Sequence, residues 1–527
     1  MKTWQWWQDS VFYQIYLPSF CDGNADGLGD FIGLEQKVDY LAELGITGVW
    51  ITPFYPSPLV DNGYDISDYC AVDSRFGSMD NFRNVVAACH AKGIRVVIDL
   101  VINHVSTEHL WFKEAFNNPQ SHYRDYFIFS SQPNNWQSFF SGSAWQAEPD
   151  TGQYYYHQFS PQQVDLNWAN PQVEQEIFAV IDFWLAQSVD GFRFDVINFL
   201  TTDGVGPDNP EIDGQQQHEN DVNQPGIEHA LRRICHYVRE QGDYFLIGEI
   251  GSEELPVLSR YQSPELMDVV FNFNLGSQKT FDVARLFGEL QAMCKQQTGM
   301  PTLFFSSHDM PRMIGRFGET ERDTPRARAV MVLQLTALGV PFIFQGDELG
   351  MSNYLPKTAE QIFDIQGKTH YQTALATGLS DSDALVRAIS QSRDGSRSPL
   401  PWSTAPFSGF SCVKPWMPLN PNSLEINADT QRQQPDSLWH EYQKIIALRH
   451  ASSSLRTGGY RDLGRTGNCI WYSRESEDES TWVAVNFGEP IRSPWCEINA
   501  TTVAGNESEW LGKNEFIIKR SCYAKAQ

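Results

Sequence analysis

The sequence of 527 residues predicts an α/β protein built on a (β/α)₈ barrel with two added domains. Three features support this: eight short apolar runs, amphipathic stretches between most of them, and long intervals that break the alternation. Apolar strands that alternate with helices indicate a parallel sheet covered on both faces. Eight such strands favour a closed TIM barrel, and a doubly wound open sheet is the alternative. The runs are VFYQIYLPSF (11–20), GVWITPF (48–54), GIRVVIDLVINH (93–104), GFRFDV (191–196), YFLIGEI (244–250), MDVVFNFNL (267–275), TLFFSSHD (302–309) and PFIFQGDELG (341–350).

Helices are expected where apolar residues recur at helical spacing between these runs. Clear examples are LEQKVDYLAELG (34–45), MDNFRNVVAACHAKG (79–93) and SLWHEYQKIIALRHA (437–451). The longest apolar stretch, 329–344, is short for a membrane span and is interrupted by Pro341. We therefore expect a buried helix followed by a buried strand in that stretch.

Two intervals are too long for ordinary loops between a strand and a helix. Residues 105–168 are rich in aromatic residues, Asn and Ser and show no helical period, which predicts a small inserted domain. A second insertion, at about 351–400, follows the eighth strand. In the tail, NCIWYSRE and STWVAVNFG alternate as antiparallel strands do. The predicted units are the barrel (1–104 and 169–450), the inserted domain (105–168) and a C-terminal β-sandwich domain (451–527).

The composition excludes several classes of partner and compartment. A net charge of −26 and a pI near 4.8 argue against nucleic acid or an anionic membrane as the main partner. The 9 cysteines are scattered without a C-x-x-C pair, which indicates free thiols in a reduced compartment. The N-terminal stretch has no apolar signal core, so we expect a cytoplasmic protein. The sequence does not indicate an oligomeric state.

Ionisable and other polar residues lie toward the C-terminal ends of several of the apolar runs. The carboxyl ends of barrel strands meet at one mouth, so these side chains should converge there. Carboxylates with Arg and His, and no phosphate-binding Gly loop, favour glycosyl transfer, which needs a carboxylate nucleophile and a protonated carboxylic acid. The residues are Asp99, Asn103 and His104 in the third run, Arg193 and Asp195 in the fourth, Glu249 in the fifth, and His308 and Asp309 in the seventh.

The local sequence assigns different protonation states to these acids. Arg193 precedes Asp195 by two residues, lies on the same strand face and should favour its ionised, nucleophilic form. Glu249 lies between apolar residues, and burial should raise its pKa, as a general acid requires. Asp309 is positioned to stabilise a developing positive charge on a sugar ring.

Several motifs, in order, resemble the signature regions of the α-amylase family, glycoside hydrolase family 13. The four main regions are DLVINHVS (99–106), GFRFDVIN (191–198), IGEI (247–250) and FSSHDMPR (305–312), and VDLNW (164–168) resembles a fifth. DNGYDISDY (61–69) and RDGSRSPLPW (393–402) resemble the α-glucosidase and oligo-1,6-glucosidase branch. The resemblance is close over about 5–450 and loose in the tail.

The resemblance implies a double-displacement mechanism that retains the α configuration. Carried over by motif, Asp195 is the nucleophile, Glu249 the general acid/base and Asp309 the third carboxylate. Arg193 then holds Asp195. A retaining enzyme should hold the carboxyl groups of Asp195 and Glu249 about 5 to 5.5 Å apart.

The resemblance also implies residues that bind the sugar at the cleavage point. His104 and His308 would donate hydrogen bonds to it, and Tyr64 would stack under its ring. Asp61 and Arg397 would pair with each other and cap the non-reducing end. Such a cap closes the pocket, so the enzyme would remove one glucose at a time from a chain end.

The linkage preference depends on residues around the leaving sugar. Val196 resembles the residue found after the nucleophile in family members that prefer α-1,6 bonds, although a plain strand residue is the alternative. Phe159 and Trp145 are candidate platforms for the second sugar, or core residues of the inserted domain. The segment 201–226 has no Lys or Arg, which disfavours a phosphorylated substrate. It could cover the pocket or bind the leaving sugar.

The expected activity is therefore an exo-acting α-glucosidase on isomaltose, isomalto-oligosaccharides or dextran ends. The alternatives are an α-1,4-glucosidase, a trehalose-phosphate hydrolase, and a transglucosylase or isomerase of the sucrose isomerase type. A non-catalytic partner subunit is a remote alternative, since the three carboxylates are present.

A metal site is expected near the N-terminus, at CDGNADGLGD (21–30). Its D-x-[DN]-x-D-G-x-x-D pattern resembles a loop that binds Ca²⁺ or Mg²⁺ in this branch of the family. The Glu that would close an EF-hand is replaced by Gly33, which fits a structural site. The alternative is a turn without metal. The predicted ligands are the side chains of Asp22, Asn24, Asp26 and Asp30 and the carbonyl of Leu28.

Overall fold

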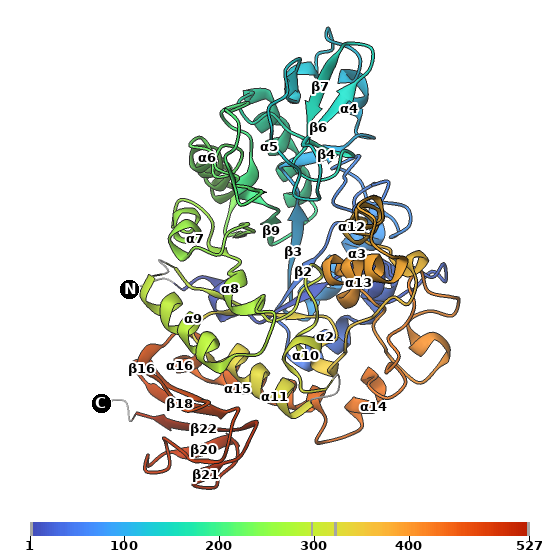
Figure 1. The fold of residues 1–527 in the computed structure, drawn as a ribbon. Helices are drawn as coiled ribbons and strands as arrows, with labels where there is room; N and C mark the ends of the chain where they lie inside the picture. Colours follow the sequence, from blue (N-terminus) through green and yellow to red (C-terminus); the bar gives the residue numbers. More distant parts are fainter. Residues whose placement is uncertain (1–3, 297–298, 321–323, 524–527) are drawn as a thin grey trace.

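The computed structural model describes residues 4–296, 299–320 and 324–523, so the predicted domain ends at 1–3 and 524–527 lie outside it. The predicted fold class is confirmed: eight parallel strands form a nearly closed barrel (Figure 1). The strands are β1 (Phe12–Ile15), β2 (Gly48–Ile51), β3 (Arg95–Leu100), β9 (Gly191–Phe194), β12 (Phe245–Gly248), β13 (Val269–Val270), β14 (Thr302–Leu303) and β15 (Val340–Phe344). Their order is β13-β12-β9-β3-β2-β1-β15-β14, and the opening lies between the two-residue strands β13 and β14.

The strands are shorter than the apolar runs that predicted them, because each run continues as buried loop. Along a strand, side chains alternate between the barrel interior and the helix-facing side. Aromatic residues fill the interior at its N-terminal end, where the ring of Phe12 stacks on Phe245 at 5.1 Å and on Phe342 at 4.8 Å. Trp7, from the segment before β1, stacks on Phe245 at 5.4 Å. We call these four residues the aromatic floor.

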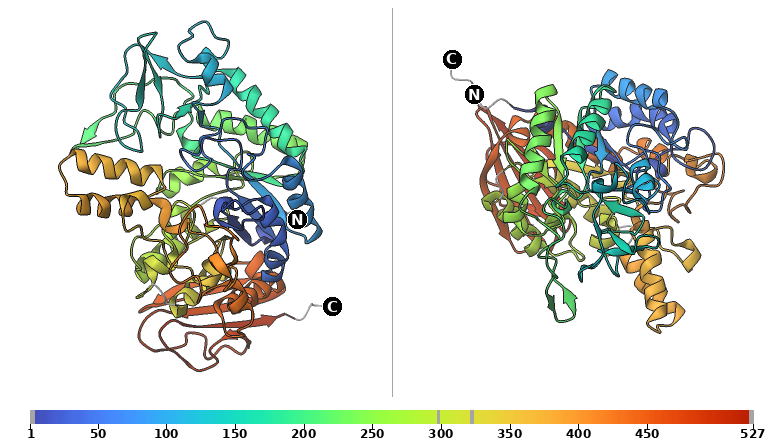
Figure 2. Two further views of the ribbon diagram at one scale, coloured as in Figure 1. Left: turned by 90° about the vertical axis from the view of Figure 1, so that its right-hand side faces the viewer. Right: turned by 90° about the horizontal axis from the view of Figure 1, so that it is seen from above.

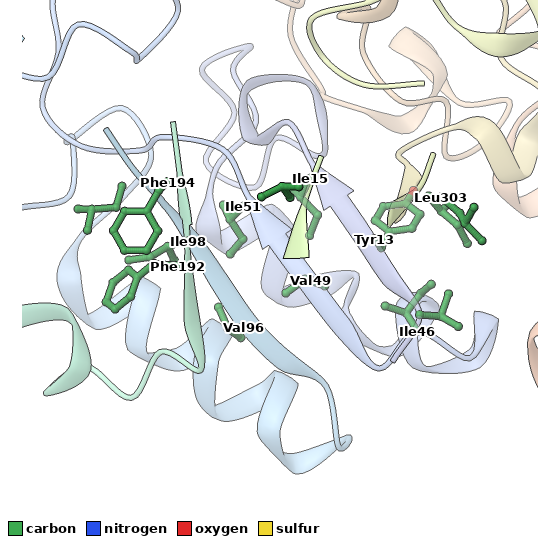
Figure 3. Close-up of a cluster of buried hydrophobic side chains, with 14 of the residues drawn as sticks. Tyr13, Ile15, Ile46, Val49, Ile51, Val96, Ile98, Phe192, Phe194 and Leu303 are labelled. Carbon is green, nitrogen blue, oxygen red and sulfur yellow. The ribbon is translucent and has the colours of Figure 1, made fainter. Parts of the chain in front are cut away.

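The opposite strand face packs against helices. Tyr13, Ile15, Val49 and Ile51 belong to this buried layer, which Figure 3 shows beside the strands. The predicted helix at 34–45 is present as two short helices, and the predicted buried helix and strand at 329–344 are α11 and β15. The helices around the barrel are α1 (Phe31–Gln36), α2 (Val38–Leu44), α3 (Met79–Ala91), α5 (Pro171–Leu185), α6 (Ile227–Gln241), α7 (Leu255–Tyr261), α8 (Phe273–Gly276), α9 (Val283–Gln296), α10 (Met313–Phe317), α11 (Thr324–Thr336) and α15 (Leu438–Ala451).

The same alternation carries the ionisable residues to the inside of the barrel mouth. In β3, Val97 belongs to the interior cluster, so Asp99 two residues later also points inward. Asp99 lies opposite Arg193 in the register of β3 and β9, and Ile247 of β12 lies opposite Arg193 on the other side. Glu249 follows Ile247 by two residues and therefore faces the same interior.

The insertion after β3 folds as a small separate layer above the barrel (Figure 1). Its strands form a two-stranded and a three-stranded antiparallel sheet, β4-β8 and β5-β7-β6. Trp136, Trp145 and Tyr156 form its own core. Trp145 is therefore a core residue of this domain and not a sugar platform. The elements are β4 (His104–Ser106), α4 (Leu110–Ala115), β5 (Phe129–Ser130), β6 (Trp145–Glu148), β7 (Gln153–Tyr156) and β8 (Gln163–Asp165).

Two further additions follow β15. A helical hairpin, α12 (Ile365–Ala376) and α13 (Asp381–Gln391), extends from the body of the protein (Figure 2), and α14 (Ala428–Arg432) comes before α15. The tail forms a five-stranded antiparallel sheet, β16-β17-β18-β22-β20, with β19 and β21 paired separately. One face of the large sheet joins the main core, and the other covers Trp495 and Leu511. The strands are β16 (Gly459–Thr466), β17 (Cys469–Glu475), β18 (Glu479–Asn486), β19 (Ile491–Arg492), β20 (Thr501–Gly505), β21 (Trp510–Leu511) and β22 (Glu515–Cys522).

Among the described residues, no helix combines the length and the apolar character that a membrane crossing needs. The exact limits of the three predicted domains remain predictions.

We predict that Phe12→Ala strongly destabilises the protein, because it removes the ring that connects both sides of the aromatic floor. A buried Phe→Ala change costs about 3–5 kcal/mol, which should lower the urea midpoint of unfolding clearly. Trp510→Ala is the control, since Trp510 is 57% exposed, and surface changes stay within about 0.5 kcal/mol. Equal midpoints for the two variants would contradict the role given to Phe12.

Candidate active site

A pocket with about 410 Å³ of empty space, partly open to solvent, lies at the carboxyl ends of the barrel strands. Most of its lining was predicted from the sequence, whereas Phe140, Gln163 and Arg393 were not. The lining residues are Asp61, Tyr64, His104, Phe140, Phe159, Gln163, Asp195, Val196, Glu249, Asp309 and Arg393.

One buried guanidinium holds three carboxylates together at the base of the pocket. Arg193 Nη1 lies 2.6 Å from Asp99 Oδ1 and 2.5 Å from Asp195 Oδ1. Its Nη2 lies 2.6 Å from Glu249 Oε2. The indole Nε1 of Trp50 donates to the other oxygen of Asp99 at 2.8 Å. Arg193 therefore fixes the predicted nucleophile and the predicted acid relative to each other.

Burial gives the two acids different proton affinities. It raises the pKa of Asp195 to about 6, although the charge of Arg193 opposes the rise. The sequence predicted the direction of the Arg193 effect, but desolvation outweighs it. Burial raises the pKa of Glu249 further, to about 8, and the nearby Asp195 adds to the rise while Arg193 opposes it. Between these values Asp195 is ionised and Glu249 is protonated.

Asp195 and Glu249 lie close enough for the charge of Asp195 to raise the pKa of Glu249. Their separation of about 5 to 5.5 Å, expected for a retaining enzyme, remains a prediction.

Asp309 carries a permanent negative charge beside this pair. Burial alone would raise its pKa, but His308 and the guanidiniums of Arg393 and Arg397 outweigh it and hold the pKa below the usual range. Arg397 Nη2 lies 3.0 Å and Arg393 Nη1 3.5 Å from Asp309 Oδ1. An anion fixed in this way can stabilise positive charge that develops on a bound ligand.

The predicted pairing of Asp61 with Arg397 is wrong. Asp61 pairs with Arg393, whose Nη2 lies 2.5 Å from Asp61 Oδ1. Arg397 is fully buried, where it contacts Asp309 and its Nε donates to the His308 carbonyl at 2.7 Å. The motif RDGSR carries both arginines on one short turn, and the fold of that turn directs only the first toward Asp61.

The carboxylate of Asp364, missed in the sequence, holds Arg393 in place. It accepts hydrogen bonds from Arg393 Nη2 at 2.5 Å and from Nε at 3.0 Å, and it is fully buried. Asp364 also caps the N-terminus of α12 by accepting from Gly367 N–H. The helical hairpin is thereby fixed to the pocket wall.

The two histidines are neutral near pH 7, because burial lowers the pKa of His104 to about 4 and of His308 to about 3. His308 Nδ1 lies 2.6 Å from Gln14 Nε2, and its Nε2 lies 2.7 Å from the hydroxyl of Tyr64. The rings of His308 and Tyr64 also stack, with centroids 5.4 Å apart. His104 Nε2 lies 3.1 Å from Gln163 Nε2. The sugar-binding roles of these residues remain predictions.

The residue after Asp195 has an unusual backbone. Val196 has φ 41° and ψ 48°, in the left-handed region that a β-branched side chain rarely adopts. Such a conformation costs about 1–3 kcal/mol and tends to occur at functional sites. Here it lets the Val196 N–H approach Glu249 Oε2 at 3.4 Å while the side chain lines the pocket.

Aromatic rings form the wall of the pocket on the side of the inserted domain. Phe159, predicted as a platform, lies 5.5 Å from Phe140 and 5.5 Å from His104. The ring of Phe140 also lies beneath the guanidinium of Arg393 at 5.5 Å. The side-chain amide of Gln163 donates to Asp61 Oδ2 at 3.0 Å. Gln163 directly precedes the fifth motif, VDLNW (164–168).

The loop at 21–30 has the donor atoms expected for Ca²⁺ or Mg²⁺, since both prefer oxygen ligands. Its carboxylates already accept backbone N–H groups. Asp22 accepts from Ala25 at 2.7 Å and from Gly27 at 2.8 Å, and Asp30 accepts from Asn24 at 2.9 Å. Within the described ranges, no group of three or more His, Cys, Asp or Glu is arranged to hold a metal ion. The predicted site, with Asp26, Leu28 and the other ligands named above, therefore remains a prediction.

Comparisons with known proteins place this geometry in a family. The family model "Alpha amylase, catalytic domain" matches residues 14–458. The glucan 1,6-alpha-glucosidase of Streptococcus dysgalactiae subsp. equisimilis is 36% identical over 504 residues, covering 92% of each chain. The trehalose-6-phosphate hydrolase of Escherichia coli (strain K12) is 35% identical over 511 residues, covering 93% of this chain and 92% of that protein.

Solved structures agree with these sequence matches. The crystal structure of the trehalulose synthase MutB from Pseudomonas mesoacidophila MX-45 has a TM-score of 0.92 and 35% identity, and the match covers 98% of this chain and 100% of that one. The family model, the relatives and the fold all lead to one assignment. The chain belongs to the α-amylase family, glycoside hydrolase family 13, and is a glycoside hydrolase of its α-glucosidase branch.

Proposed function

We propose that the enzyme is a retaining, exo-acting α-glucosidase that hydrolyses α-1,6 bonds at the non-reducing ends of short oligosaccharides. The observation that carries the exo mode is the ion pair between Asp61 and Arg393, which lies in the pocket wall beside Asp309. An ion pair there closes the pocket beyond one sugar ring, so only a chain end can enter.

The mechanism follows from the protonation states of the three acids. Asp195, ionised, attacks the anomeric carbon while Glu249 gives its proton to the oxygen of the leaving sugar. Asp309 stabilises the positive charge on the ring during this step. Glu249, now ionised, takes a proton from water, and the resulting attack on the anomeric carbon releases glucose and frees Asp195. Retention results from the two inversions.

The linkage proposal rests on Val196. Its branched side chain lines the pocket next to the nucleophile, where it would shape the wall that the leaving sugar meets. The alternatives are an α-1,4-glucosidase, a trehalose-phosphate hydrolase, and a transglucosylase or isomerase, since relatives of two of these kinds match about equally well. A phosphorylated leaving group would need a free cation. The arginines at the site, Arg193, Arg393 and Arg397, all contact carboxylates.

We predict that glucose is released from isomaltose well above maltose, trehalose and sucrose at equal concentration. Val196→Ala should lower the isomaltose-to-maltose ratio of kcat/KM by about ten-fold, because a methyl-sized change in a pocket is worth about 1–3 kcal/mol. Asp195→Ala is the inactive control. If maltose is the better substrate for the wild type, the linkage proposal is wrong and the mechanism stands.

We predict a bell-shaped pH profile of kcat/KM, with limbs near pH 6 and pH 8. Activity should rise as Asp195 loses its proton and fall as Glu249 loses its own. With α-glucosyl fluoride, whose leaving group needs no proton, Glu249→Gln should keep the lower limb and lose the fall near pH 8. A fall that persists in this variant would exclude Glu249 as its cause.

We also propose that the loop at 21–30 binds Ca²⁺ or Mg²⁺ as a structural ion. Both oxygens of Asp26 and Asp30 Oδ1 each accept from one described donor and keep a second lone pair for a cation. Both oxygens of Asp22 and Asp30 Oδ2 accept from two donors each, so a cation bound there would displace one of them. Ca²⁺ added to EDTA-treated protein should then raise the melting temperature, since a ligand at 100 Kd stabilises by about 2.7 kcal/mol. Asp26→Asn should abolish the shift, and Asp80→Asn, on exposed α3, should not. Identical melting with EDTA and Ca²⁺ would reject the site.

A further inference from the structure

The segment 201–226, which the sequence left unassigned, is fastened to the inserted domain. Asn135 Nδ2 donates to the carbonyl of Asn209 at 2.8 Å, and Asn209 N–H donates back to Asn135 Oδ1 at 2.8 Å. Trp136 Nε1 donates to the Pro207 carbonyl at 2.9 Å, and Gln216 Nε2 donates to the Asn135 carbonyl at 2.8 Å. The tip of the segment, β10 (Glu211–Ile212) and β11 (Gln215–Gln216), forms a hairpin that projects from the body (Figure 2). Its base is therefore part of a fixed wall.

This wall contains a stacked pair of rings, His218 and Phe139. Their centroids are 4.1 Å apart and their planes differ by 25°. His218 Nδ1 lies 2.7 Å from Asp221 Oδ2, and Asn209 Nδ2 donates to the other oxygen of Asp221 at 3.0 Å. Asp221 is buried, whereas the His218 side chain is 23% exposed. The His218 imidazole is thus held by Phe139, which stacks on one face of the ring, and by Asp221, which contacts Nδ1.

The contact with Asp221 determines what His218 can offer a ligand. The contact of Nδ1 with the Asp221 carboxylate favours the tautomer that has its proton on Nδ1, and in that tautomer Nε2 is an acceptor. No protein group in the described ranges forms a hydrogen bond with Nε2. A partly exposed ring pair with an available acceptor is suited to a sugar, which offers an apolar C–H face and hydroxyl donors.

The pair lies one aromatic layer outside the pocket wall. Phe139 is 5.9 Å from Phe159, which lines the pocket, and 4.8 Å from Phe199. Phe199 in turn packs against the loop that carries the general acid: a Cβ on Gly251, two residues after Glu249, would lie 2.7 Å from Phe199 Cε2. If the first leaving sugar contacts Phe159 in the pocket, a longer leaving group would extend past it toward Phe139 and His218.

We propose that Phe139 and His218 form a binding platform for the second sugar of the leaving group. The proposal rests on the proposed glucosidase function and makes it more specific: the enzyme is adapted to trisaccharides and longer chains. The second sugar packs its C–H face on the rings, and one of its hydroxyls donates to His218 Nε2. The absence of Lys and Arg from 201–226 matches a neutral sugar.

The test compares kcat/KM for isomaltotriose, whose leaving group has two sugars, with that for isomaltose, whose leaving group has one. Phe139→Ala and His218→Ala should each lower the isomaltotriose-to-isomaltose ratio by about ten-fold, the effect of losing an interaction of about 1.4 kcal/mol. His218→Asn, which keeps a donor toward Asp221 without the ring, should lower it as well. His218→Phe keeps a ring without Nε2 and should recover part of the ratio.

His236→Ala is the matched control, because His236 lies on the exposed face of α6 and pairs only with Glu240 among the described residues. Its ratio should equal that of the wild type. Equal losses on both substrates in the platform variants would indicate a structural role and overturn the proposal, as would unchanged ratios. If the wild type prefers maltose, the same ratio is taken with maltotriose and maltose. A failure of the linkage proposal is thereby distinguished from a failure of the platform.

Discussion

A single buried guanidinium sets the geometry of the pocket. Arg193 is 1% exposed and contacts Asp99, Asp195 and Glu249, which come from three neighbouring strands. A charge removed from water must be paired, and removing one partner leaves the others uncompensated at a cost of about 3–5 kcal/mol. The three strand ends are therefore constrained together. Arg193 lowers the pKa of both Asp195 and Glu249, and burial outweighs it and raises the pKa of Glu249 further.

A second arginine plays a comparable structural part on the other side of the barrel. Arg312 is fully buried and donates to the carbonyls of Gln345 at 2.7 Å and of Ser396 at 2.8 Å. It thus connects the end of β15 to the turn that carries Arg393 and Arg397. Together with the contacts between Asp364 and Arg393, this fastens the long insertion after β15 to the pocket. Residues far apart in the chain therefore line the same wall of the pocket. The buried hydrogen-bond donors of Arg312 and Arg393 restrict the positions that the insertion can take.

Much of this could be predicted from the sequence, since it follows from simple periodicities. The eight apolar runs predicted the barrel, and the convergence of strand ends predicted that Asp99, Arg193, Asp195 and Glu249 meet at one mouth. Two-residue alternation placed Arg193 and Asp195 on the same strand face. Contacts that depend on the path of irregular loops could not be predicted. The resemblance named Arg397 as the partner of Asp61, but the turn that carries Arg393 and Arg397 directs Arg393 to Asp61. The pKa of Asp195 could not be predicted either. Burial raises it and Arg193 lowers it, and which effect is larger depends on how much water the fold excludes from the carboxylate.

The aromatic floor has a consequence for how such an enzyme handles its substrates. With the barrel interior filled by Trp7, Phe12, Phe245 and Phe342, the far end offers no exit for a cleaved sugar. A product released in a closed pocket must then leave by the route through which the chain end arrived. If the enzyme acts on chain ends as proposed, the shortened chain has to withdraw first, and successive cuts on one chain are separate binding events. Substrate binding and product release then use the same pocket entrance, and free monosaccharide in solution competes with substrate for the pocket.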